Sequence, residues 1–235
     1  MAGCPLKCSF CATGSLGFGR VLRSNEIIDQ VLTLQERTNL PVAGVTWMGQ
    51  GEPLLALSSV ERATDALAEG LRIGRKRMTL STVGIPGRIK RLAHKHLGCT
   101  LTVSLHASNQ ALREQIIPSA KSYLLDAMFE ELKEYELITG RPPCWEYLLL
   151  GDGFNDTDEH AHELAELLHS WKLPYHTNLI EWNPVPGMPF SGPTRDRTMS
   201  FQRILRKNGI PATIRRSAGP DEAAACGQLK NTVAK

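Results

Sequence analysis

Apolar residues recur along this chain with two different periods, and the two periods alternate. Short apolar runs, typical of buried strands, are separated by longer stretches in which apolar residues recur at helical spacing. The pattern predicts six strands, at residues 43–48, 78–82, 101–105, 145–150, 177–180 and 213–216, and helices that include 25–37, 58–71, 122–138 and 196–208. Consecutive β–α units of this kind form a parallel sheet with right-handed crossovers.

Nearly every polar motif falls directly after one of these strands. In a β/α barrel that edge of the sheet carries the active site. A doubly wound open sheet is the alternative, but no predicted strand is followed by G-x-G-x-x-G. We therefore expect an α/β fold that forms a partial (β/α) barrel. It should be a single domain over 1–235, with a loop at 1–20, β/α repeats at 21–210, and a C-terminal strand and loop at 211–235.

Capping residues mark several helix ends. Ser24 is predicted as the N-cap of the helix at 25–37, with Glu26 in the first turn near the positive end of the helix dipole. Thr157 is predicted to cap the helix that follows the fourth strand. Gly209 is a candidate C′ residue for the helix at 196–208.

Composition places the chain among globular proteins. Its 235 residues are 42% hydrophobic and 22% charged, enough for one sizeable core. No apolar run reaches transmembrane length, and cysteines and glycines interrupt residues 1–20, which argues against a signal peptide. The six cysteines favour a reducing compartment and a cofactor over a disulfide scaffold. We expect a cytoplasmic protein with no membrane association.

Three cysteines near the start have the most specific spacing in the chain. Cys4, Cys8 and Cys11 follow the pattern C-x3-C-x2-C. A structural zinc site usually has four protein ligands, whereas a cubane iron–sulfur cluster with three cysteine ligands keeps one iron open for a substrate or cofactor. The alternatives are a zinc site completed by a remote His or Cys, or free thiols in the core.

Polar residues after later strands provide a candidate ligand site. Gly51-Glu52-Pro53 follows the first predicted strand, and a glycine there allows close backbone approach while the carboxylate can pair with an ammonium group. Four further polar residues occupy similar positions after or at the ends of later strands: Ser81, Ser104, His106 and Asn183. Alone, each is an ordinary structural group, but a ring of them facing one cavity would line a nucleoside site.

Together these motifs resemble those of one enzyme family. The segments MGQGEPLL at 48–55, TLST at 79–82, SLHA at 104–107, WNP at 182–184 and AACGQL at 224–229 occur in order, after a cysteine loop with an aromatic Phe10 before its third cysteine. The chain resembles, over almost its whole length, the radical S-adenosylmethionine (SAM) adenine-C2 RNA methyltransferases of the RlmN/Cfr type. Relatives that modify C8 share these motifs.

The resemblance implies cofactors and site residues. A [4Fe–4S] cluster would be held by Cys4, Cys8 and Cys11. SAM would be held by Gly51, Glu52, Ser81, Ser104, Leu105, His106 and Asn183. Cys226 would be the catalytic methyl carrier: one SAM methylates its thiolate, and a 5′-deoxyadenosyl radical from a second SAM activates the S-methyl group for addition to adenine C2. The alternative for Cys226 is a buried small apolar residue.

The resemblance also implies partners. The substrate would be ribosomal RNA, with transfer RNA as a second candidate, and the electron donor a flavodoxin or ferredoxin; we expect a monomer. A net charge of +3 does not itself predict RNA binding. Basic clusters occur at Arg72, Arg75, Lys76 and Arg77, at Arg88, Lys90, Arg91 and Lys95, at Arg203, Arg206 and Lys207, and at Arg215 and Arg216. Solvated faces explain the helical clusters equally well, so phosphate contact fits Arg215 and Arg216 best.

The chain departs from the family pattern at its N-terminus. The family has an upstream accessory domain, a strand leading into the cysteine loop and, on that strand, a resolving cysteine; all lie before Cys4, so the chain is expected to be truncated. Cys99 and Cys144 precede strands at the opposite end and should be too far away to replace that cysteine. We also expect the strand at 43–48 to have an unpaired edge, and the cysteine loop to be tethered on one side only.

Two other functions are also consistent with the sequence. One is a truncated core that cleaves SAM but does not complete methyl transfer, because the resolving thiol is missing. The other is a non-catalytic RNA-binding module with zinc, or no metal, at the cysteines.

Overall fold

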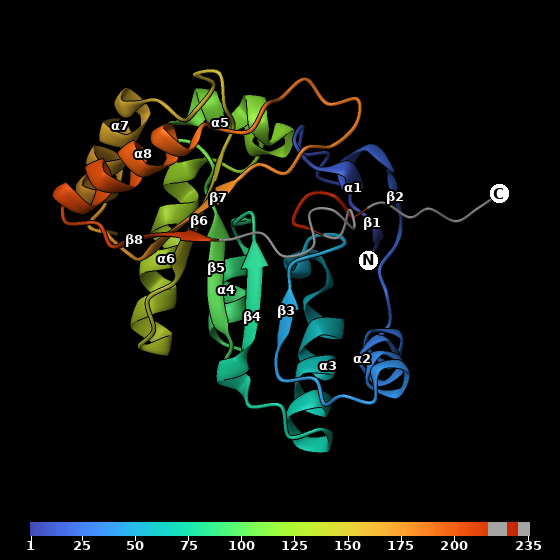
Figure 1. Ribbon diagram of the computed structural model, residues 1–235. Helices are drawn as coiled ribbons and strands as arrows, with labels where there is room; N and C mark the ends of the chain where they lie inside the picture. The colour runs from blue at the N-terminus through green and yellow to red at the C-terminus, as the bar shows by residue number, and fades with distance from the viewer. Residues whose placement is uncertain (216–224, 230–235) are drawn as a thin grey trace.

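Six parallel strands form one sheet in sequence order (Figure 1). The computed structural model describes residues 1–215 and 225–229. The strands are β3 (Val45–Trp47), β4 (Met78–Thr82), β5 (Thr100–Ser104), β6 (Cys144–Leu149), β7 (Thr177–Glu181) and β8 (Ala212–Arg215). Every predicted strand is present, and the partial barrel is confirmed. Arg216 and the rest of the predicted final loop up to residue 224 lie outside the described residues.

Helices connect the strands and cover the outer face of the sheet (Figure 1). They are α2 (Ser24–Thr38), α3 (Leu57–Gly70), α4 (Arg88–Ala93), α5 (Gln110–Ile116), α6 (Leu125–Thr139), α7 (Asp158–Ser170) and α8 (Arg195–Lys207), with a short α1 (Ala12–Ser15) and 3₁₀ turns at Pro53–Ala56, Arg75–Arg77 and Pro118–Lys121. Among the described residues, no helix is long and apolar enough to cross a membrane.

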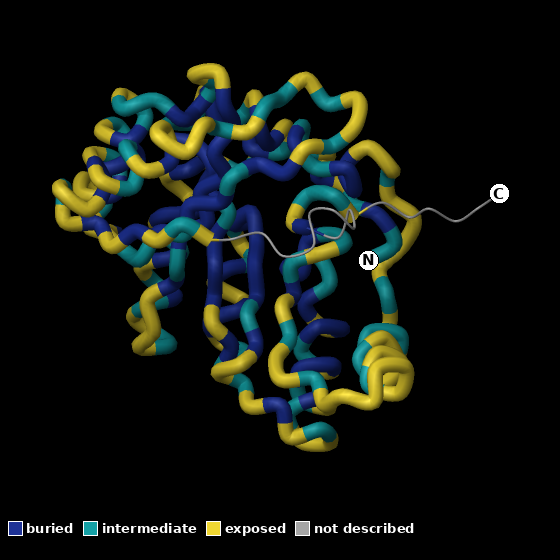
Figure 2. Tube along the Cα trace, viewed as in Figure 1, coloured by how far each residue is buried: buried dark blue, intermediate teal, exposed yellow. Residues whose placement is uncertain are grey.

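The apolar core lies between the sheet and these helices (Figure 2). Trp145 of β6 and Phe129 of α6 are completely buried and meet edge to face with ring centroids 5.7 Å apart. The Trp145 indole N–H donates to the carbonyl of Leu173 at 3.0 Å, so this polar atom is satisfied inside the core. Burial of the outer face leaves the inner face of the sheet for polar chemistry.

Helix ends agree with the predictions in two cases out of three. Thr157 caps α7, where its hydroxyl accepts from the backbone N–H of His160 at 3.3 Å. Gly209 adopts a left-handed conformation, with φ of 74°, directly after α8 and its C-cap. The prediction for Ser24 is wrong, because Arg23 is the N-cap of α2 and its N–H donates to Glu26 at 2.8 Å. The carboxylate of Glu26 therefore sets the start of the helix.

Two further differences concern chain boundaries. The helix predicted from residue 122 begins at Leu125, because residues before it form a 3₁₀ turn and Leu124 has an extended conformation. The N-terminal residues contain a small antiparallel pair, β1 (Ala2–Gly3) and β2 (Phe18–Arg20), too short to leave a periodic signal. Within the described residues β3 pairs with β4 alone, so its other edge is unpaired, as predicted.

Candidate active site

A cavity of about 410 Å³ opens at the C-terminal edge of the sheet. On β6, Glu146 lines the cavity while the neighbouring Trp145 and Tyr147 belong to the core, as the period of a strand requires. Among the predicted site residues, the following line it: Cys4, Cys8, Cys11, Gly51, Glu52, Ser81, Ser104, His106 and Cys226. Leu105 and Asn183 do not line it. The structure therefore brings together groups that lie as far apart in sequence as Cys4 and Cys226.

The cluster loop, residues 1–20, is fixed on several sides. Its Cys4 N–H donates to Gly17 at 2.9 Å within the loop, and its Ser9 N–H donates to Ile116 at the end of α5 at 3.0 Å. The indole N–H of Trp182, after β7, donates to the carbonyl of Phe10 at 3.0 Å. The expectation that this loop is tethered on one side only is therefore wrong, because contacts from α5 and from the end of β7 hold it.

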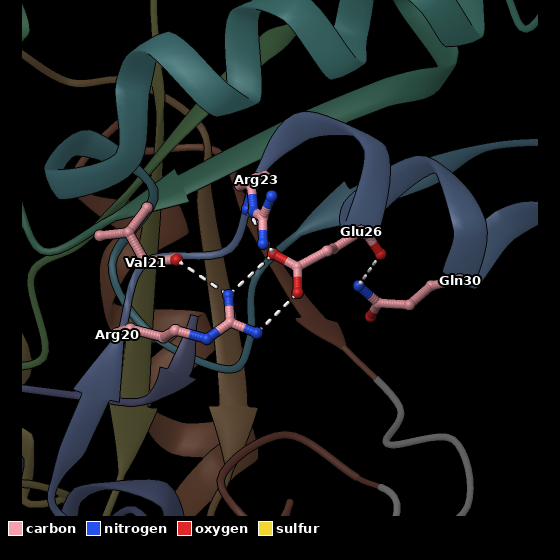
Figure 3. A network of polar contacts seen from close by, with 5 residues as sticks. All are labelled: Arg20, Val21, Arg23, Glu26 and Gln30. Carbon is pink, nitrogen blue, oxygen red and sulfur yellow. Dashed lines mark hydrogen bonds and ion pairs between the residues drawn. The ribbon is translucent and has the colours of Figure 1, made fainter.

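The turn between the cluster loop and α2 is held by an ion-pair network (Figure 3). Both terminal nitrogens of Arg20 donate to the Glu26 carboxylate, at 2.8 and 2.6 Å, and these hydrogen bonds lower the pKa of Glu26 to about 2.

Inside the cluster loop, a Cβ added to Gly14 would lie 2.9 Å from the Cys8 carbonyl oxygen. Only glycine therefore allows α1 to pack this closely on Cys8.

The three thiols of the cluster loop fit a cluster better than a single ion. All three are free and line the same cavity. In the part of the chain that the structure describes, no three His, Cys, Asp or Glu side chains come together as ligands of one metal ion. A cubane cluster takes its cysteines on separate irons, so three free thiols at one cavity suit it. Burial raises the pKa of Cys4 and of Cys8, so a bound cluster would have to stabilise their thiolates.

Glu52 is buried and already holds three protein groups. One carboxylate oxygen accepts from Leu54 N–H at 2.9 Å and from the Thr82 hydroxyl at 2.7 Å, and the other accepts from Val83 N–H at 2.9 Å. A carboxylate has about four acceptor positions, so one remains for a ligand. Burial raises the pKa of Glu52 to about 7, although these three hydrogen bonds act to lower it. Gly51 has a φ of 99°, and an added Cβ there would collide with Met1.

His106 lines the cavity with one ring nitrogen already engaged. Its Nδ1 accepts from the backbone N–H of Leu148 at 3.0 Å, which leaves the proton on Nε2. Burial, with the nearby charge of Arg113, lowers the pKa of His106 to about 3, so the ring is neutral at physiological pH. Phe10 packs against it edge to face at 5.2 Å. Leu105, which is fully buried, can contribute only through its backbone.

Cys226 lies in a turn at residues 225–229 that docks on the cluster loop; we call this turn the carrier loop after the role predicted for Cys226. The Ala12 N–H donates to Gly227 at 2.7 Å and the Thr13 hydroxyl donates to Leu229 at 2.8 Å. Cys226 lines the cavity, and desolvation, together with the nearby Cys11 thiol, raises the pKa of its thiol to about 11. The thiol is therefore protonated at neutral pH until a bound ligand changes its surroundings.

Two amide side chains fix the carrier loop from the β7 side. Asn183 donates to the Cys226 carbonyl at 3.2 Å. Gln228 accepts from Ala225 N–H at 3.2 Å and donates to the Pro184 carbonyl at 3.0 Å. Asn183, predicted as a SAM ligand, thus has a contact with the carrier loop, and its role toward SAM stays a prediction.

Sequence reasoning missed three buried polar residues around the site. Arg113 is completely buried and donates to the carbonyls of Val83, Ser104 and Leu105, at the ends of β4 and β5. Asn155 donates to the carbonyls of His106 and Leu148 at 2.9 and 2.7 Å. Glu146 lines the cavity. Of these, only Glu146 left a signal, as a lone acid inside an otherwise uncharged strand.

Basic residues and the remaining cysteines are mostly remote from the cavity. Arg72 and its cluster precede β4, at the other edge of the sheet, and Arg75 there pairs with Asp65 at 2.8 Å. Of the predicted basic clusters, only Arg215 lines the cavity among the described residues. Cys144 begins β6, and Cys99 directly precedes β5 and lines a separate cavity, so both lie at the opposite end as expected.

Comparisons with known proteins agree with this geometry. The sequence profile of the Radical SAM superfamily matches residues 1–168. A "Probable dual-specificity RNA methyltransferase RlmN" from Trichormus variabilis is 47% identical over 233 residues, which cover 99% of this chain and 65% of the relative. A protein of the same name from Thermosynechococcus vestitus is 48% identical, over 97% of this chain and 67% of the relative. A radical SAM methyltransferase from Sphaerobacter thermophilus superposes with a TM-score of 0.91 at 40% identity, covering 97% of this chain and 67% of its own.

The fold and the three-cysteine loop thus define a member of the radical SAM superfamily, whose cofactors are a [4Fe–4S] cluster and SAM. Within that superfamily, the chain belongs to the RlmN-type RNA methyltransferase family. It spans 65% of the Trichormus relative and 67% of the Thermosynechococcus relative.

Proposed function

We propose that this chain is the catalytic core of an RNA methyltransferase that adds a methyl group to C2 of an adenine, in ribosomal RNA and, as a second substrate class, in transfer RNA. The observation that carries the proposal is the meeting of four thiols at one cavity, three from the cluster loop and Cys226 from the carrier loop. We further propose a single-domain cytoplasmic monomer that receives electrons from a flavodoxin or ferredoxin.

Cys4, Cys8 and Cys11 would hold the cluster at the cavity that they line. Gly51, Glu52, Ser81, Ser104 and His106 would hold SAM, with the free acceptor position of Glu52 toward its ammonium group. When bound, the cluster supplies the electron that cleaves SAM reductively and so generates a hydrogen-abstracting radical. The chain's own contribution is to orient SAM and to exclude water from the apolar part of the cavity.

Cys226 would act as a nucleophile. Its sulfur attacks the methyl carbon of SAM, a new carbon–sulfur bond forms, the sulfonium carbon–sulfur bond breaks, S-adenosylhomocysteine leaves, and the thiol proton passes to solvent. The product is S-methylcysteine at position 226. Adenine C2 is electron-poor and reacts poorly with an electrophilic methyl group, which is why a covalent carrier that delivers carbon in radical form is needed. Asn183 and Gln228 hold the loop from which Cys226 reaches the cavity.

The test is anaerobic reconstitution with iron and sulfide, followed by incubation with methyl-labelled SAM, a strong reductant and RNA. We expect a brown protein, 5′-deoxyadenosine, and labelled 2-methyladenosine in the digested RNA. Formation of 5′-deoxyadenosine with covalent protein–RNA adducts and no released product would support the methylation-incompetent core instead. A colourless protein that contains zinc would support the RNA-binding module.

A further inference from the structure

Glu146 is a buried acid whose second oxygen has no partner. Its side chain is 2% exposed, and its Oε1 accepts from the Asn178 amide at 3.2 Å and lies 3.6 Å from a guanidinium nitrogen of Arg215. Oε2 is buried without a hydrogen bond, although the residue lines the cavity. A buried carboxylate oxygen without a partner is costly, so a ligand donor at this position would be strongly favoured.

Strand register explains how Glu146 is held. Ser104, Glu146, Asn178 and Thr213 pair with one another across β5, β6, β7 and β8 and form one polar row. The Thr213 hydroxyl donates to the side-chain amide oxygen (Oδ1) of Asn178 at 2.9 Å and contacts Nε2 of His176 at 3.0 Å. This chain of contacts orients the Asn178 amide toward Oε1, which leaves Oε2 of Glu146 without a hydrogen-bond partner.

The next row of the same face has a different character. Leu148, Ile180 and Arg215 pair across β6, β7 and β8, two residues further along each strand. With Met48 they give the cavity apolar walls beside one guanidinium. Apolar walls beside an acceptor on Glu146 and a donor on Arg215 suit a flat heteroaromatic ring that carries an amino group beside a ring nitrogen.

We propose that Glu146 and Arg215 form a subsite for the amino edge of adenine, in which Oε2 accepts from the exocyclic 6-amino group and Arg215 donates to a neighbouring ring nitrogen. The proposal rests on the proposed function, because that function brings two adenines to this cavity, one in SAM and one in RNA. A ribose diol is a poorer match, since a carboxylate that clamps a diol needs both oxygens and Oε1 is already engaged.

The binding test compares ligands that differ only at position 6 of the purine. S-adenosylhomocysteine and S-inosylhomocysteine probe the SAM adenine. AMP and IMP, added with saturating S-adenosylhomocysteine, probe the RNA adenine. Binding is measured by calorimetry on the protein with its thiols reduced. For one of the two ligand pairs, the amino ligand should bind at least about tenfold more tightly than the oxo ligand, which is the size of a hydrogen bond to a charged group. The arm that shows it identifies which adenine occupies the subsite.

Variants then assign the preference to Glu146. Glu146→Gln should abolish or invert it, because an amide can donate to a 6-oxo group. Glu163→Gln, at an acid that accepts from Asn109 outside the cavity, should leave it unchanged. Arg215→Met removes the guanidinium beside Glu146 and should weaken binding of the amino ligand.

Equal binding of the amino and oxo ligands in both arms, or an unchanged preference in Glu146→Gln, would overturn the proposal. Absence of binding in both arms would overturn it as well, because the residues of the subsite are already in place. Failure of RNA methylation is a separate result: a Glu146-dependent preference without turnover keeps the subsite and rejects the proposed function.

Discussion

The hydroxyl of Thr13 donates a hydrogen bond of 2.8 Å to the carbonyl oxygen of Leu229, across a sequence separation of 216 residues. It joins the cluster loop to the carrier loop, next to the 2.7 Å bond between Ala12 and Gly227. The position of Cys226 is therefore set by the same loop that carries the three cluster cysteines. The Cys226 thiol and the three cysteines of residues 1–20 are therefore held as one unit.

Thr13→Val should loosen the carrier loop. Valine keeps the shape of threonine but removes the donor, which costs about 1 kcal/mol and raises the open population of the loop several-fold. Alkylation of Cys226 by iodoacetamide, followed peptide by peptide in mass spectrometry, should become several-fold faster. Thr33→Val, at an exposed position of α2, is the control. Equal alkylation rates in all three proteins would contradict the account.

Asn155→Ala should be strongly destabilising. The Asn155 side chain accepts from Leu150 N–H at 2.6 Å and donates to two carbonyls, all in the core beside His106. Removing it leaves buried backbone groups unpaired, and we expect a loss of about 3 kcal/mol in the free energy of unfolding. Urea denaturation measures the loss. Asn25→Ala, exposed in the first turn of α2, should change stability by less than about 0.5 kcal/mol.

Glu146→Gln should change how stability depends on pH. Burial raises the pKa of Glu146 to about 7 from 4.5, against the opposing effects of Arg215 and Asn178. The folded protein therefore binds the proton more tightly, and this contribution to stability is present below pH 4.5 and is lost as pH rises through 7. Glutamine does not titrate, so the variant does not lose stability in this way. The free energy of unfolding of the variant, minus that of wild type, should therefore rise by about 3 kcal/mol between pH 4.5 and 8.

Urea denaturation of both proteins across this pH range checks the prediction. Glu163→Gln serves again as the control, because it removes a carboxylate outside the cavity. A stability difference between wild type and Glu146→Gln that stays constant with pH would mean that Glu146 ionises normally in the folded protein.

Glu52→Ala should weaken SAM binding and leave the cluster in place. The carboxylate is the cavity's candidate partner for the SAM ammonium, and removing it should lower SAM affinity at least tenfold. Equilibrium dialysis measures the affinity, and iron analysis reports the cluster. Because Glu52 also holds Thr82 and Val83, the folded state is checked by circular dichroism. Unchanged affinity in a folded variant would remove Glu52 from the SAM site.

Local patterns were enough to predict the strands and much of the site. Gly51, Ser81 and His106 could be placed because each follows or ends a strand, and parallel strands bring those ends to one edge. The contacts of Gln228 with Pro184 could not be predicted, because they depend on how two distant loops pack. Arg113 gave no signal either, since its role is to satisfy carbonyls that only the folded sheet brings together.

The central claim is that Cys226 carries a methyl group, and mass spectrometry of the peptide that contains it tests this most directly. After anaerobic reconstitution and incubation with methyl-labelled SAM, we predict one labelled methyl group on Cys226. Cys226→Ala should keep its iron and SAM binding, and should lose both the label and all RNA methylation. An unlabelled Cys226 in a protein that still methylates RNA, or loss of iron in Cys226→Ala, would contradict the carrier role.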